Sequence, residues 1–151
     1  MRGYFGVGIY HPKTEVNIGS LWRTADILGA AFVFTIGRRY SPQCSDTGKA
    51  WKHIPLFHYE TVESLWDSLP RECRVIGVEL DNKAVPLERF YHPEQAIYLL
   101  GAEDHGLPEE VLKKCHGLVK LTGDRSMNVA VAGSIVIYDR QRQRVKLLPS
   151  N

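Results

Sequence analysis

Short apolar runs alternate along the chain with segments in which apolar residues recur at helical spacing. Several of the runs are almost continuously apolar, as the strands of a parallel sheet are when both of their faces are buried. The runs that predict strands lie at 4–10, 31–36, 54–59, 74–80, 96–101 and 117–121. Strands that alternate with helices through short connections indicate an α/β fold, with a mainly parallel sheet and helices on both of its faces.

Helical periodicity predicts helices at 17–30, 61–70, 107–115 and from 128 to 144. In the first of these, Asn17 precedes the apolar positions as an N-cap does, and Gly29 supplies a C-terminal stop. The last helix is apolar nearly all round as far as Tyr138. Such a helix is buried on more than one side, so we expect it to contact both the core and a partner subunit.

The composition is that of an ordinary globular protein, with 44% hydrophobic and 24% charged residues in 151. No repeat, low-complexity segment or long linker divides the chain, so we expect one domain over residues 1–151. No apolar run approaches the ~20 residues that a membrane helix needs, and the first residues lack the apolar core of a signal peptide. We therefore expect a cytoplasmic protein without a membrane partner.

The three cysteines, Cys44, Cys73 and Cys115, are odd in number and widely spaced. This spacing indicates neither a disulfide framework nor a zinc site, and it fits reduced thiols in a cytosolic protein. The motifs GxGxxG, HExxH and GxSxG and the P-loop are all absent, so no metal site and no nucleotide-binding or serine-hydrolase site is expected. Cys115, at the end of an apolar helix, is interpreted as a packing residue.

The net charge is only +2, but basic residues gather in two stretches. One of them follows the second predicted strand and contains Arg38, Arg39, Lys49 and Lys52, with Trp51 among them. A local basic face binds phosphates even when the whole chain is nearly neutral, and an aromatic side chain can stack on a base. These residues are our candidates for RNA binding, and a solvated surface is the alternative interpretation.

Three segments remain as candidates for a site, at 17–30, 99–108 and 124–134. The second follows a buried strand and contains two glycines, which let a ligand approach the main chain at the sheet edge where open α/β folds bind ligands. The third precedes the last helix, which Ser126 or Asn128 can cap. Taken singly, each segment is a turn as readily as a site.

Taken together, the segments contain N-x-G-x-x-x-R, then G-x-E-x-x-G-[LI]-P, then S-[LM]-N-[VL]. The matching residues are Asn17, Gly19 and Arg23; Gly101, Glu103, Gly106, Leu107 and Pro108; and Ser126, Met127, Asn128 and Val129. In this order, and over nearly the whole chain, they resemble the SPOUT superfamily of RNA methyltransferases, in its SpoU (TrmH-like) branch of ribose 2′-O-methyltransferases. One departure is the stretch before Ser126, which has Leu121-Thr122 where the family commonly has Ile-Pro, in a shorter loop.

The resemblance implies a SPOUT fold with a C-terminal trefoil knot, a homodimer, and S-adenosylmethionine as the cofactor without a metal. It places the cofactor against Val78, Leu100, Gly101, Leu121, Ser126 and Met127. It implies methyl transfer to a ribose 2′-hydroxyl of RNA, with Arg23 at the phosphate and the developing alkoxide, either within one subunit or across the dimer interface. Asn128 and Glu103 would orient the loops and Arg23, and Asn17 would cap the helix that carries Arg23.

The resemblance makes transfer RNA the first expected substrate and ribosomal RNA the second, because family members this small, without an added RNA-binding domain, often act on transfer RNA. Two other classes compete with this interpretation. A non-catalytic RNA-binding protein on the same fold would explain the altered loop before Ser126, but not the retention of Arg23 and Asn128. A flavodoxin-like or response-regulator module would explain the α/β pattern, and it would leave all three motifs as coincidences.

Overall fold

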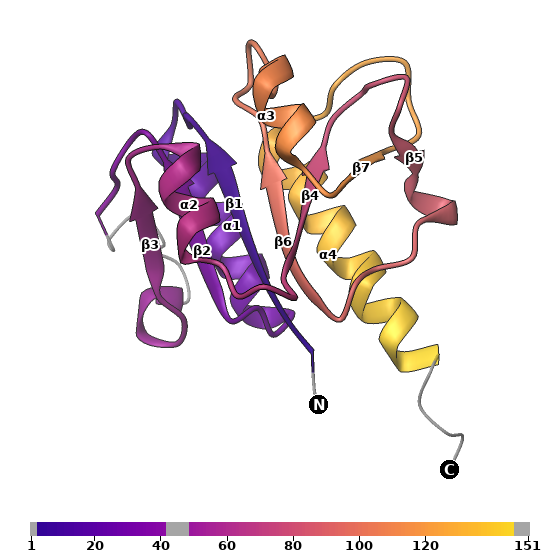
Figure 1. The fold of residues 1–151 in the computed structure, drawn as a ribbon. Coiled ribbons are helices and arrows are strands. Elements are labelled where there is room, and N and C mark those ends of the chain that lie inside the picture. Colours follow the sequence, from indigo (N-terminus) through magenta and orange to yellow (C-terminus); the bar gives the residue numbers. More distant parts are fainter. Residues whose placement is uncertain (1–2, 42–48, 147–151) are drawn as a thin grey trace.

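The computed structural model describes residues 3–41 and 49–146, and Cys44 lies outside these ranges. Its strands form one sheet in the order β3-β2-β1-β6-β4-β7-β5, and every neighbouring pair is parallel (Figure 1). The strands are β1 (Tyr4–Tyr10), β2 (Phe32–Ile36), β3 (Leu56–Tyr59), β4 (Arg74–Val78), β5 (Val85–Pro86), β6 (Gln95–Leu100) and β7 (Gly117–Lys120). The expected α/β class with a parallel sheet is confirmed.

Helices cover both faces of the sheet, as expected. The helices are α1 (Glu15–Ile27), α2 (Val62–Ser68), α3 (Glu109–Lys114) and α4 (Val129–Lys146), with 3₁₀ turns at Ala50–Lys52 and Leu87–Arg89. In Figure 1, α2 and α3 lie in front of the sheet, whereas α1 and α4 lie behind it. Helix α1 also packs against α4, so the first and last helices of the chain share one layer. None of the helices in the described ranges is long and apolar enough to cross a membrane.

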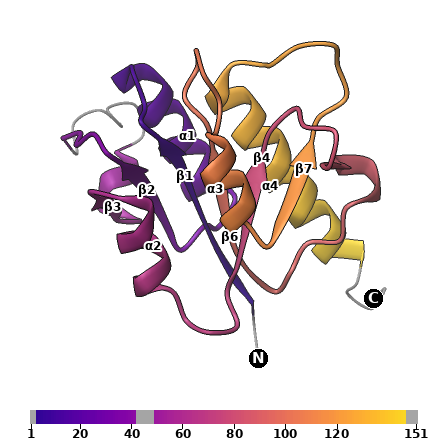
Figure 2. The same ribbon diagram turned by 45° about the horizontal axis from the view of Figure 1, so that its top comes forward.

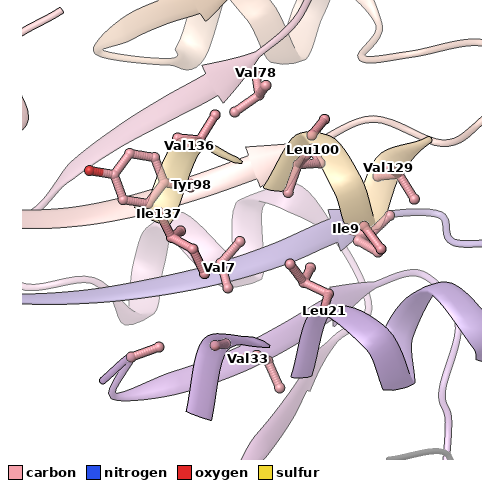
Figure 3. Close-up of a cluster of buried hydrophobic side chains, with 14 of the residues drawn as sticks. Val7, Ile9, Leu21, Val33, Val78, Tyr98, Leu100, Val129, Val136 and Ile137 are labelled. Atoms are coloured by element: carbon pink, nitrogen blue, oxygen red, sulfur yellow. The ribbon is translucent and has the colours of Figure 1, made fainter. Parts of the chain in front are cut away.

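The larger core lies between the sheet and the layer of α1 and α4. Figure 3 shows Leu21 of α1 and Ile137 of α4 pointing toward Val7 of the central strand β1. The same cluster continues to Val78 and Leu100, which end β4 and β6. Burial on both faces explains why these strands read as continuous apolar runs. The core therefore reaches the edge of the sheet where the strands end.

The first helix differs from its prediction at its start. It begins at Glu15, and the N-cap position belongs to Thr14 in extended conformation, so the assignment of Asn17 as the cap is wrong. Asn17 lies within the first turn and is 8% exposed, because its side chain is used in contacts with two other segments of the chain. A polar residue before an apolar periodicity is a capping signal only when its side chain is not needed elsewhere.

The predicted stop of that helix is confirmed. Gly29 has φ of +86°, a left-handed conformation that glycine adopts without a steric penalty. The amide of Gly29 donates to the carbonyl of Asp26 at 3.2 Å, and the amide of Ala30 donates to the carbonyl of Ala25 at 2.9 Å. This pair of hydrogen bonds is a Schellman motif, and it turns the chain directly into β2.

The C-terminal half of α4 is fixed by a buried arginine. Arg140 is 1% exposed, and its guanidinium donates to the carbonyls of Pro93 and Glu94 at 2.5 and 2.6 Å. The preceding residue, Asp139, accepts a hydrogen bond from the ring of His92 at 2.8 Å, and burial lowers the pKa of that histidine. These contacts anchor α4 to the loop before β6, so the opposite end of the helix is held in place where β6 ends.

Candidate functional site

A cleft of about 290 Å³ opens beside the carboxyl ends of β4, β6 and β7, the edge that Figure 2 brings forward. Its lining comes from the strand ends, the two following loops and the start of α4: Val78, Glu79, Leu80, Leu100, Gly101, Ala102, Glu103, Asp104, His105, Gly106, Leu121, Arg125, Ser126, Met127, Val129 and Ala132. Its volume is near the lower end of the range of about 300–1,000 Å³ for small-molecule sites. All six residues expected at the cofactor line this one cleft, together with Glu103.

The loop after β6 brings main chain into the cleft. Ala102 and Gly106 form an isolated antiparallel bridge, which folds the loop back on itself, and Gly106 has φ of +61°. A Cβ on Gly101 would lie 2.3 Å from the carbonyl carbon of Gly106. Only glycine permits this approach of one backbone segment to another, so the strand end stays open to a ligand.

Glu79 is a residue of the cleft that our sequence analysis did not identify. Its Oε2 accepts a hydrogen bond from the amide of Leu107 at 2.8 Å, and its Oε1 accepts one from the amide of Leu80 at 3.1 Å. The carboxylate thereby ties the end of β4 to the far side of the loop after β6. The available signal was an acidic residue directly after a buried strand, which is where an α/β sheet presents ligand-binding groups.

One hydrogen-bonded chain joins the three motif segments. The Asn17 amide of α1 donates to the Glu103 carboxylate of the loop after β6 at 2.5 Å. The Asn128 amide donates in turn to the Asn17 side-chain carbonyl at 3.0 Å. Asn128 also caps α4, because its Oδ1 accepts from the amides of Ala130 and Val131 at 2.9 and 3.2 Å. Of the two residues that the sequence allowed as the cap, the structure has Asn128.

We expect replacement of Asn128 by alanine to lower the free energy of unfolding by about 1–3 kcal/mol, since it removes an N-cap and leaves the partly buried Asn17 carbonyl without its donor. Urea unfolding monitored by circular dichroism measures this as a lower midpoint at unchanged slope. The matched control is Asn82→Ala in an exposed turn. Equal midpoints for the two variants would show that the Asn17–Glu103–Asn128 chain adds nothing to stability.

Arg23 lies apart from the cleft lining, on the exposed side of α1. Within residues 3–41 and 49–146, the side chains of Glu103 and Asn128 are hydrogen-bonded to Asn17 and not to Arg23. Arg23 shares its helix face with Val16 and Ile27, whose side chains are strongly exposed. Arg23 and these two apolar side chains therefore belong to one exposed face of α1.

The four basic residues expected at RNA do not lie together. Arg38 and Arg39 follow the carboxyl end of β2, whereas Lys49 and Lys52 precede the start of the parallel neighbour β3, at the opposite edge of the sheet. Arg39 pairs with Glu60 at 3.6 Å on the surface, and Lys52 lies 5.4 Å from the ring of Trp51. A single basic loop in the sequence is thus divided in space by the length of a strand.

Arg38 is the basic residue of this group that is tied to the rim of the cleft. Its guanidinium donates to the carbonyl of Lys13 at 3.1 Å, and the Lys13 ammonium pairs with Asp104. The hydrogen bond from Lys13 holds the pKa of Asp104 below its ordinary value. The turn after β1 is thereby held between the loop after β2 and the loop after β6.

Metal and thiol chemistry find no support in the residues of the cleft. No group of three or more metal-ligating side chains occurs in the described part of the chain. Burial raises the pKa of Cys115 to about 12, so its thiol stays protonated at neutral pH, in agreement with a packing role. The arrangement offers instead apolar walls, exposed main chain and carboxylates, which suit an organic ligand that carries positive charge.

Comparison with known proteins gives matches along nearly the whole chain. The model of the SpoU rRNA Methylase family matches residues 5–138. An uncharacterized tRNA/rRNA methyltransferase of Archaeoglobus fulgidus is 31% identical over 150 residues, which are 94% of this chain. The chain spans only part of its curated relatives: 66% of the Archaeoglobus protein, and 9% of a mouse tRNA (guanosine(18)-2′-O)-methyltransferase that is 27% identical over 140 residues.

Solved structures share the fold. A structure described as giving insight into the 2-OH methylation of C/U34 on tRNA is 29% identical, with a TM-score of 0.83, and the match covers 95% of this chain and 98% of that one. The SpoU methyltransferase AviRb of Streptomyces viridochromogenes, in complex with the cofactor AdoMet, is 22% identical, with a TM-score of 0.84 over 97% of this chain and 62% of that one.

Proposed function

We infer that this chain, which belongs to the SpoU rRNA methylase family, transfers a methyl group from S-adenosylmethionine to a ribose 2′-hydroxyl of transfer RNA. The observation that carries the proposal is that two distant motif segments line one cleft, and that hydrogen bonds from Asn17 to Glu103 and from Asn128 to Asn17 join the third motif segment, on α1, to both of them. A relative of nearly the same length, whose description names 2-OH methylation of C/U34 on tRNA, supports transfer RNA over ribosomal RNA. Nucleotide 34 is therefore the first position to test.

The cleft fits the proposed cofactor. Val78, Leu100 and Leu121 provide apolar walls for an adenine ring, and the open main chain at Gly101 provides hydrogen-bonding groups for its edge. Ser126 and Met127 would close the cleft from the loop before α4. When bound, the sulfonium supplies an electrophilic methyl group, so the task of the protein is to align the ribose 2′-oxygen with it.

We assign the handling of RNA at the reacting centre to Arg23. A guanidinium stays protonated, so it is poorly suited to act as a base. It is well suited to bind the phosphate beside the target ribose and to stabilise the alkoxide that develops on the 2′-oxygen. Arg38, at the rim of the cleft, is the second candidate for a phosphate contact. Arg39, Lys49, Lys52 and Trp51 are proposed to contact more distant parts of the RNA.

A homodimer would place Arg23 beside a cleft. The exposed face of α4 carries Val131, Ile135 and Tyr138, which are 50%, 39% and 61% exposed at helical spacing. The neighbouring residues Val129 and Ala132 of the same helix line the cleft. Helix α1 packs against α4, and we propose that one partner covers both this apolar face and the Arg23 side of α1. We propose that Arg23 of one subunit serves the cleft of the other.

Replacing Ile135 by glutamate is expected to convert the dimer to a monomer, since a charge at the centre of an apolar interface loses its hydration without a partner. Sedimentation velocity measures the change, and methyl transfer should fall with the dimer fraction. Val85→Glu, an equally exposed valine on β5, is the control that should remain dimeric. A monomeric wild-type chain, or a dimeric Ile135→Glu variant, would contradict the proposed interface.

We also propose that the C-terminal part of the chain is threaded into a trefoil knot, as in the SPOUT fold, and that the protein acts in the cytoplasm. The placement of β7 between β4 and β5, with α4 returning to pack on β6 and α1, supports the knot. A crystal structure traced through residues 74–130 decides the threading. Fractionation of cells decides the location, and recovery in a membrane or organelle fraction would overturn it.

The proposed activity is tested with the purified chain, methyl-labelled S-adenosylmethionine, and total tRNA or ribosomal RNA from cells that lack the gene. The RNA is digested to nucleosides, and a labelled 2′-O-methyl nucleoside from tRNA is the expected product. Label found only in ribosomal RNA would change the assigned substrate from transfer RNA to ribosomal RNA. Tight RNA binding without cofactor binding would overturn the enzyme and favour the non-catalytic RNA-binding protein.

A further inference from the structure

Glu79 is a carboxylate of the cleft whose charge is not neutralised by a neighbouring cation. Its two oxygens accept from the main-chain amides of Leu107 and Leu80, and no lysine or arginine in residues 3–41 or 49–146 forms an ion pair with it. Backbone amides orient a carboxylate without cancelling its net charge. Glu79 therefore combines a fixed position with a free negative charge.

The other charged groups of the cleft differ from Glu79 in this respect. Asp104 lines the cleft, but its charge is paired with that of Lys13, which does not line it. Arg125 lies on the strongly exposed loop before α4, beside Asp124 at 3.4 Å. Glu103 accepts from the neutral amide of Asn17. Among the described residues that line the cleft, the carboxylates of Glu79, Glu103 and Asp104 outnumber the one arginine, Arg125, and the ion pairs of this lining leave Glu79 and Glu103 with neutral partners, so the lining has an excess of negative charge.

This excess of negative charge distinguishes the two forms of the proposed cofactor. S-Adenosylmethionine has a positive sulfonium, and methyl transfer removes that charge. The bond between sulfur and the methyl carbon breaks with its electron pair going to sulfur, the methyl carbon bonds the ribose 2′-oxygen, and the 2′-hydroxyl proton leaves to solvent. The remaining S-adenosylhomocysteine is a neutral thioether at that sulfur. A fixed negative charge in the cleft attracts the first form more than the second.

We propose that Glu79 is a specificity-determining residue, whose charge makes the cleft bind the sulfonium cofactor in preference to its thioether product. This inference rests on the proposed function. Its hydrogen bond to Leu107 fixes the loop after β6, and its charge supplies the discrimination. Spent cofactor then leaves more readily than fresh cofactor, because the attraction ends when the methyl group is transferred. The residue acts on cofactor exchange and needs no contact with RNA.

Two substitutions separate the charge from the hydrogen bond. Glu79→Gln keeps a side-chain oxygen that accepts from the Leu107 amide but removes the charge. Glu79→Ala removes both. Glu110→Gln, on the exposed first turn of α3, removes a carboxylate that does not line the cleft and serves as the control.

Isothermal titration calorimetry of the full chain with three ligands measures the effect without any catalytic turnover. In Glu79→Gln we expect the Kd for S-adenosylmethionine to rise about 3- to 10-fold, as for loss of one partly screened charge interaction. The Kd for S-adenosylhomocysteine should stay within about twofold, and sinefungin, whose amine replaces the methyl sulfonium with another cation, should follow S-adenosylmethionine. Glu79→Ala should weaken all three ligands, because the loop is released as well.

An equal change for charged and neutral ligands in Glu79→Gln, or the same change in Glu110→Gln, would overturn the charge selection and leave the proposed function intact. A wild-type chain that binds neither S-adenosylmethionine nor S-adenosylhomocysteine would overturn the proposed function, and this inference with it. Circular dichroism melting of each variant confirms that the titrated protein is folded.

Discussion

Replacement of Arg23 by alanine is expected to lower kcat for methyl transfer by at least about 1,000-fold, the scale of losing a preorganised group that stabilises developing charge. The Kd for S-adenosylmethionine should change by less than about twofold, because Arg23 does not line the cleft. Single-turnover transfer to tRNA measures the first quantity, and calorimetry measures the second. Because Arg23 lies on the exposed side of α1, we expect kcat to fall while the Kd for S-adenosylmethionine stays nearly constant.

Two further variants make this result specific. Arg23→Lys keeps a positive charge but loses the planar fork of donors, so it should restore only a small part of the rate. Arg71→Ala removes an arginine from the turn before β4, at the opposite edge of the sheet, and should retain full activity. A loss of cofactor binding in Arg23→Ala would contradict the assignment of Arg23 to RNA binding at the reacting centre.

Replacement of Gly101 by alanine is expected to weaken S-adenosylmethionine binding by more than about 100-fold, because overpacking against backbone forces the loop to move. A Cβ at this position lies 2.3 Å from the carbonyl carbon and 2.5 Å from the Cα of Gly106, and 2.6 Å from the amide nitrogen of Leu107. All three atoms are main chain, so no side-chain rotation relieves the contact. Calorimetry measures the affinity, and thermal melting measures the accompanying loss of stability.

Gly117→Ala is the matched control for that experiment. The nearest atom to a Cβ there is the terminal methyl of Ile76, at 3.3 Å, which can shift by a few tenths of an ångström. Cofactor affinity in this variant should equal that of the wild-type chain. If Gly101→Ala also bound normally, the loop after β6 would not be the wall against which the cofactor packs.

The sequence was sufficient to predict most of the strands and a ligand site at the edge of the sheet where they end. Apolar runs were long enough to locate the strands of the described residues other than β5, whose two residues, Val85 and Pro86, leave no periodicity to detect. The motif residues Gly101, Glu103, Ser126 and Met127 come from two loops that the sequence marks with glycine and polar side chains, and the parallel sheet brings those loops to one edge.

What the sequence left open depends on which partner each polar side chain selects. Asn17 has the composition of a cap, but its partners, Glu103 and Asn128, lie 86 and 111 residues away. Glu79 reads as an ordinary surface acid until the loop after β6 is seen folded onto it. Lys49 and Lys52 are close to Arg38 and Arg39 along the chain, yet a parallel strand pair separates them, because the connection must return to the starting edge of the sheet.

The hydrogen bonds that join Asn17, Glu103 and Asn128 also limit when the site can form during synthesis. During synthesis, α1 emerges before the loop after β6, and α4 emerges after both. Segments that are far apart along the chain must meet before the third motif has a partner, and such long-range closure is slow compared with local helix formation. A nascent chain that still lacks α4 therefore lacks part of the lining of the proposed methyl-donor site, so we expect this site to form only after α4 has been made.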